Sequence, residues 1–173
     1  MSLLRFLGLS RAQGAEEDAE TETVRRIAGQ LERLPPEQAR FLAGFAYVLA
    51  RVAHADLEIG ADEVAEMEQI VRDIAHLTPP EAALVVQIAK SQAQHLGGTE
   101  NYVVTREFRA IASAEQRGQL LQCIYAVAAA DGTISAIESN EIMRIAEELG
   151  FTRPEANALR ASFRDKLSEF QNR

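Results

Sequence analysis

The chain has 173 residues, a formal net charge of −8, 47% hydrophobic residues and no tryptophan. This length is enough for one domain with its own core. An acidic surface repels nucleic-acid phosphates, so the charge argues against a DNA- or RNA-binding protein and favours cations or basic partners. Frequent Ala, Leu, Glu, Gln and Arg favour helices over strands.

The opening residues, Met1 to Ser10, are apolar but too short to span a bilayer, which takes roughly 18 apolar residues. Arg5 interrupts them and an acidic stretch follows, so they do not resemble a signal peptide. They are expected either to dock on a partner protein or a membrane surface, or to be a disordered or core-docked terminus. The single cysteine, Cys123, lies in an apolar run and is predicted to be a buried thiol. A cytoplasmic protein is expected.

Residues 1–23 comprise this apolar segment and an acidic stretch, which is either a linker or the start of a helix. From residue 24 onward the apolar residues recur at helical spacing. We therefore predict an all-α helical bundle of about seven to eight helices. The longest irregular piece is expected at 97–105. The predicted helices cover 24–34, 36–52, 64–74, 78–89, 106–112, 120–128, 142–149 and 152–170.

Two parts of the chain match each other. Residues 55–60 resemble 130–135, and further pairs keep the same spacing. The matched positions are Glu63 with Glu138, Glu66 with Glu141, and Thr78-Pro79-Pro80-Glu81 with Thr152-Arg153-Pro154-Glu155. This predicts an internal pseudo-twofold repeat of three-helix units, about 41–95 and 116–170, within one helical domain spanning 24–173.

Each copy has an Asp at a turn and two Glu on the next helix. The candidate metal ligands are Asp131, Glu138 and Glu141 in the second copy, and Asp56, Glu63 and Glu66 in the first. Glutamates three positions apart share a helix face, and the turn folds the Asp toward them. Clustered carboxylates favour hard cations such as calcium, magnesium or manganese. A standard EF-hand is excluded, because Val127 and Ala129 occupy the upstream ligand positions.

A structural role explains most of the same residues. Ser135 with Glu138 forms a capping box, Gly60 with Glu63 forms a weaker one, and acids near a helix N-terminus interact favourably with its dipole. Ile59 and Ile134, each apolar in a polar turn, are expected to plug their turns into the core. Capping does not require Glu66 or Glu141. His54 is either an added ligand in the first copy or a structural histidine.

The second copy, with Asp131-Gly132-Thr133-Ile134-Ser135 followed by Glu138 and Glu141, resembles the signature of the TerB-like tellurite-resistance family. The same module resembles the N-terminal region of a membrane-anchored DnaJ-type co-chaperone. The resemblance covers about residues 41–170. It implies an all-helical fold, paired acidic sites proposed to bind metal, and a link to metal-oxyanion or envelope stress. In the first copy Leu57 replaces the Gly after the Asp, so the second site is favoured.

Two functions follow as hypotheses. The first is a non-enzymatic TerB-like module that binds a divalent cation through its acidic sites in a stress response. The alternative is a metal-free adaptor that binds a protein or a membrane surface. An enzyme is not expected, because the sequence has no nucleophile elbow, phosphate loop or His/Ser/Asp order, and a metalloenzyme would lack a recognisable general base.

Overall fold

The structure is a computed structural model that describes residues 16–53, 60–93 and 98–171. Within these ranges the chain forms helices and no strand, which confirms the all-α prediction. The elements are α2 (Glu16–Glu32), α3 (Pro36–Ala53), α4 (Ala61–Ala75), α5 (Pro79–Ala93), α6 (Gly98–Ile111), α7 (Ala114–Ala128), α8 (Ala136–Glu148), α9 (Arg153–Ala161), the 3₁₀ helix η1 (Arg164–Lys166) and α10 (Ser168–Gln171).

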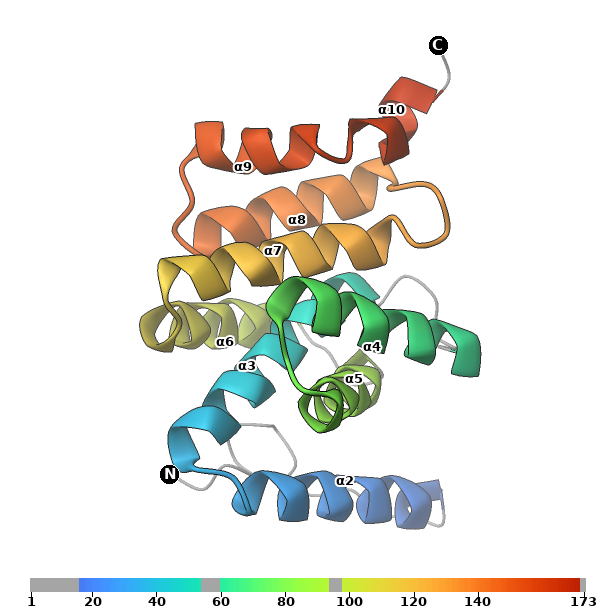
Figure 1. The fold of residues 1–173 in the computed structure, drawn as a ribbon, viewed down its shortest axis with the longest axis vertical. Helices are drawn as coiled ribbons and strands as arrows, with labels where there is room; N and C mark the ends of the chain where they lie inside the picture. The colour runs from blue at the N-terminus through green and yellow to red at the C-terminus, as the bar shows by residue number, and fades with distance from the viewer. Residues whose placement is uncertain (1–15, 54–59, 94–97, 172–173) are drawn as a thin grey trace.

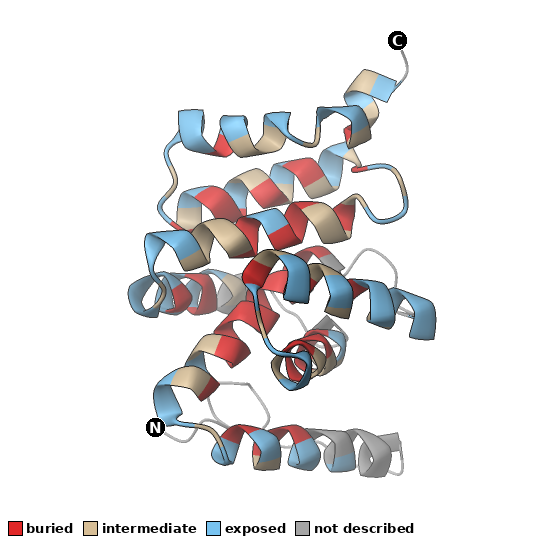
Figure 2. Cartoon of the chain, in the orientation of Figure 1, coloured by how far each residue is buried: buried red, intermediate tan, exposed pale blue. Residues whose placement is uncertain are grey.

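Helix α3 is the centre of the bundle. It packs against α5, α6, α7 and α8, and every residue from Leu42 to Val52 is buried. A helix that is buried all round belongs to the core, not to an amphipathic surface layer. In Figure 2 the part of α3 that can be seen near the centre of the molecule has the colour of buried residues. Small residues on α3 let its neighbours approach closely; they are Ala43, Gly44, Ala46 and Ala50.

The other helices form layers around α3. Figure 1 shows α7, α8 and α9 side by side at one end of the molecule and α2 at the other. Helix α4 packs on α7 and α5, and α2 buries Ile27 and Leu31 near α5. No helix in the described ranges has the length and apolarity that crossing a bilayer requires.

Three sequence predictions differ from the structure or are resolved by it. The acidic stretch is the start of a helix, because α2 begins at Glu16 and runs past residue 23. The prediction of an irregular piece at 97–105 is wrong, since α6 already begins at Gly98. Burial of one stripe of this helix, formed by Val104, Thr105 and Phe108, stabilises it. The single last helix over 152–170 is also wrong. Helix α9 ends at Ala161, and Leu167 enters a backbone bridge instead.

Two helices that the predicted repeat aligns begin with the same kind of cap. Glu81 accepts a hydrogen bond from the Thr78 backbone N–H at 2.8 Å, as Glu155 does from that of Thr152 at 2.7 Å. These bonds satisfy N–H groups that a helix start leaves open. Packing differs between the two units, because α5 packs along α3 whereas α9 packs on α8. The pseudo-twofold relation therefore stays a prediction.

An aromatic cluster joins α3 to α6. The ring centroids of Phe41 and Phe108 are 5.5 Å apart, and those of Phe45 and Phe108 are 6.2 Å apart. Gly44 lies beneath this cluster, and a Cβ at this position would lie 3.0 Å from Cδ2 of Phe108. Phe108 is fully buried and held by both other rings, so it has little room to move.

Two glycine substitutions test this packing. Alanine in a helix interior is more favourable than glycine by about 1 kcal/mol, and Gly118 on α7 has open space around its missing Cβ. We expect Gly118→Ala to stabilise the protein by about that amount. Gly44→Ala is expected to destabilise it by about 1–2 kcal/mol, because overpacking outweighs the helix preference. Urea unfolding of both variants measures this, and equal stabilisation by both would contradict the close approach of Phe108.

Candidate functional site

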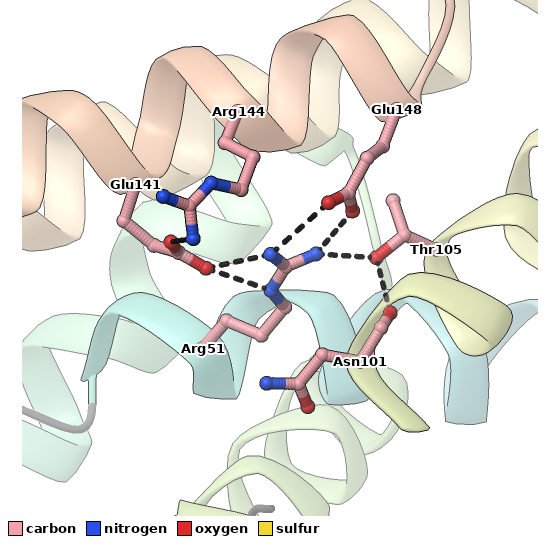
Figure 3. Close-up of polar contacts among 6 residues, drawn as sticks. All are labelled: Arg51, Asn101, Thr105, Glu141, Arg144 and Glu148. Carbon is pink, nitrogen blue, oxygen red and sulfur yellow. Dashed lines mark hydrogen bonds and ion pairs between the residues drawn. The ribbon is translucent and has the colours of Figure 1, made fainter. Parts of the chain in front are cut away.

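A buried arginine on α3 is the main polar centre of the structure. The side chain of Arg51 is 3% exposed. Its Nη2 and Nε donate to Oε1 of Glu141 at 2.6 and 3.1 Å, and its Nη1 donates to Oγ1 of Thr105 at 2.8 Å and to the carboxylate of Glu148. The hydroxyl of Thr105 extends this hydrogen-bond network by donating to the backbone carbonyl of Asn101 at 2.9 Å. Figure 3 shows the guanidinium between the two carboxylates, where α3, α6 and α8 meet.

The partners of Arg51 stabilise its charged form. Burial disfavours the charged form of the guanidinium, but the hydrogen bonds and negative charges of Glu148 and Glu141 outweigh burial and raise the pKa of Arg51 above its ordinary value. Glu141 also contacts Arg144, whose Nη1 lies 3.3 Å from Oε2. That second arginine is 68% exposed, so its ion pair contributes little.

The structure gives each candidate ligand of the second copy a protein partner. Oδ1 of Asp131 accepts the backbone N–H of Thr133 at 3.0 Å. Oε2 of Glu138 accepts the backbone N–H and hydroxyl of Ser135 at 2.8 and 2.7 Å, which confirms the predicted capping box. Glu141 pairs with Arg51, as described above. Over the described ranges, no three His, Cys, Asp or Glu side chains gather into a group that could hold a metal ion.

The first copy is only partly described. Asp56 and His54 lie outside the described residues. Oε2 of Glu63 accepts the backbone N–H of Gly60 at 2.7 Å, while Gly60 offers no side-chain cap, as predicted. Glu66 lies exposed on α4. Metal ligation by either copy therefore stays a prediction.

The turn of the second copy is packed as predicted. Gly132 has φ of 98°, a left-handed conformation that suits glycine, and Ile134 is 1% exposed. The plug role of Ile134 is thus confirmed, whereas Ile59 lies outside the described residues. Sequence reasoning missed what lies against it: the backbone of Ile134 forms an isolated parallel bridge with Leu167.

The cysteine is also placed as predicted. Cys123 is fully buried, and this burial raises the pKa of its thiol to about 12. The thiolate is the nucleophilic form of cysteine, so a thiol held protonated in the core is inert at neutral pH.

The outer side of α6 is the main exposed apolar surface. Among the described residues four large hydrophobic side chains are exposed, and three of them, Tyr102, Val103 and Ile111, lie on α6. Arg106, Glu107 and Ala110 are also exposed on this side of the helix. These six residues are called the α6 face below.

The Arg51 network yields a test against a matched control. Removing the guanidinium leaves two carboxylates close together and without a counter-charge, so Arg51→Met is expected to destabilise the protein by about 3 kcal/mol. Arg144→Met removes an exposed arginine from the same Glu141 and is expected to change stability by at most about 0.5 kcal/mol. Urea unfolding at neutral pH compares the two.

A second set of variants separates lost charge pairing from lost packing. If the stranded carboxylates cause the loss, then adding Glu141→Gln and Glu148→Gln to Arg51→Met restores part of the stability. If Arg51→Met and Arg144→Met lost similarly little stability, the buried pairs of Arg51 would stabilise the protein no more than the exposed pair of Arg144.

Comparison with known families agrees with the motif. The family model of the tellurite resistance protein TerB matches residues 42–161. This range runs from α3 to the end of α9, and it contains Arg51, Glu141, Glu148 and the Asp131 turn. The comparisons with curated proteins and with solved structures gave no match. Because the family model spans well over half of the sequence, the chain belongs to the family of the tellurite resistance protein TerB.

Proposed function

We propose that this TerB-family chain is a non-enzymatic helical module that binds a protein partner without metal. The observation that carries the proposal is the α6 face, where most of the exposed large hydrophobic side chains of the described residues gather on one helix. Scattered exposed apolar residues need no explanation, but a group on one face is typical of an interaction surface.

The composition of the α6 face supports the same function. Tyrosine and arginine are enriched among the residues that dominate binding energy, and Tyr102 and Arg106 lie one turn apart. The opposite side of α6 is anchored by Phe108 and Thr105, both fully buried, so the helix is a rigid base. From the family name we further propose that the partner acts in a response to tellurite. A cytoplasmic location remains part of this proposal.

The contacts of the acidic residues favour this adaptor role over cation binding. A cation at the second site would compete with the backbone of Thr133, with the cap at Ser135 and with the guanidinium of Arg51. Replacing these contacts costs the helix cap and leaves Arg51 short of a counter-charge.

Divalent-cation binding is kept as a second candidate because Asp131 is exposed on a turn whose backbone is already fixed by hydrogen bonds. Such preorganisation favours binding of an ion. Calcium, magnesium or manganese would be the ion, with Asp131 and Glu138 as the first ligands to test.

The α6 face is tested by one substitution and a matched control. A charge in the centre of an interface is expected to weaken binding by at least about tenfold, so Val103→Asp should lose the partners captured by the wild-type chain. Ile137→Asp places the same charge at an apolar residue on α8 that is 83% exposed, and it should keep them. Cross-linked capture from cells with quantitative mass spectrometry, followed by calorimetry with the purified partner, measures this. Partners kept by both variants, or lost by both, would rule out the α6 face.

Cation binding is tested separately by calorimetry and thermal unfolding with each of the three metals. An ion that binds only the folded chain raises its stability by mass action, about 2.7 kcal/mol at a hundredfold excess over the dissociation constant. The adaptor proposal predicts no such shift at millimolar metal. A shift that Asp131→Asn abolishes would instead support the cation site.

A further inference from the structure

Residues 165–171 are bound directly to the turn of the second acidic motif. The backbone N–H of Ile134 donates to the carbonyl of Lys166 at 2.7 Å, and the backbone N–H of Ser168 donates to the carbonyl of Ile134 at 3.0 Å. These two bonds flank Leu167 and form the parallel bridge. The turn and this segment therefore share one small hydrogen-bonded unit.

One glutamine extends the contact along the turn. Nε2 of Gln171 donates to the carbonyl of Gly132 at 2.8 Å and to that of Asp165 at 3.1 Å. Its Oε1 accepts the hydroxyl of Thr133 at 2.8 Å. Gln171 thus closes the segment onto both residues that follow Asp131.

The segment has few other attachments to the body of the protein. Within residues 164–171, all of them described, Leu167 is the one buried residue. The guanidinium of Arg164 lies 4.5 Å from the ring centroid of Phe170, which is a contact inside this stretch. Glu169 pairs with Arg160 of α9 at 2.6 Å, on the exposed surface. Buried Leu167, the half-buried ring of Phe170 packed against the core and a few hydrogen bonds are a small set of contacts next to those of α7, whose side chains fill the core.

We propose that residues 165–171 form a latch on the acidic turn, which releases as a unit while α7 and the core stay folded. Local opening occurs where buried apolar contacts are few and the hydrogen bonds are near solvent, and both conditions hold here. Release frees the backbone edge of Ile134 and the carbonyl of Gly132, so the latch controls access to these backbone groups of the Asp131 turn. This mechanism is independent of the α6 face.

The bridge can be weakened at a single atom. Ser168 is the first residue of α10, where a helix tolerates proline, and Leu167 has φ of −71° and ψ of 124°, an extended conformation that suits a residue before proline. Ser168→Pro therefore removes the N–H that bonds Ile134 without breaking the local backbone. Ser168→Ala keeps that N–H and is the matched control.

Amide hydrogen exchange of the full chain, measured by NMR, tests the latch. Ile134 reports the bridge through its own N–H, and Ile124, fully buried in the middle of α7, reports global unfolding. In the wild type we expect the Ile134 amide to exchange at least about tenfold faster than the Ile124 amide. Ser168→Pro should speed exchange of the Ile134 amide by about a further five- to tenfold, the effect of one lost hydrogen bond. It should leave the exchange rate of the Ile124 amide unchanged, and Ser168→Ala should leave both rates unchanged.

Three results would overturn the proposal. Equal exchange of Ile134 and Ile124 in the wild type would show that the turn opens only when the whole protein unfolds, and this comparison needs no variant. Equal acceleration of both amides by Ser168→Pro would show a general loss of stability. No acceleration of Ile134 in that variant would show that the bridge does not hold the turn.

Discussion

The need to neutralise one buried charge organises the centre of this protein. Arg51 is the one charged residue in the buried run from Leu42 to Val52 of α3. A buried cation is tolerated only where partners surround it, and here Glu141, Glu148 and Thr105 arrive from two other helices. The positions of α6 and α8 relative to α3 are therefore tied to one guanidinium, in addition to the apolar packing that brings the helices together.

Features set by neighbouring residues were predictable from the sequence, whereas features set by distant ones were not. The cap at Ser135, the turn at Gly132 and the plug at Ile134 were each predicted from residues a few positions apart. The pair Gly97-Gly98 predicts a break where α6 in fact begins, while the buried stripe that stabilises α6 involves α3. The break after α9 depends on Ile134, which is distant in sequence from Leu167.

In the acidic motif, too, the contacts between neighbouring residues were predictable and the contacts between distant residues were not. The sequence correctly indicated that capping explains Glu138 and leaves Glu141 unexplained. A metal ligand was one explanation for the second glutamate, and pairing with Arg51 is the one that the structure supplies. The signal was present as a lone arginine in an apolar run, but nothing in the spacing of the residues connects Arg51 to a carboxylate so far along the chain.

This pairing also explains why the two copies of the motif are unequal. If the copies are aligned on their Asp residues, Ala126 stands where the first copy has Arg51, so the second copy has no arginine to offer in return. Glu141 is therefore bound to an arginine of the other copy, whereas Glu66, its counterpart, lies exposed on α4. The two glutamates that the predicted repeat aligns therefore differ in their surroundings: Glu141 is paired with a buried arginine, and Glu66 lies at the surface.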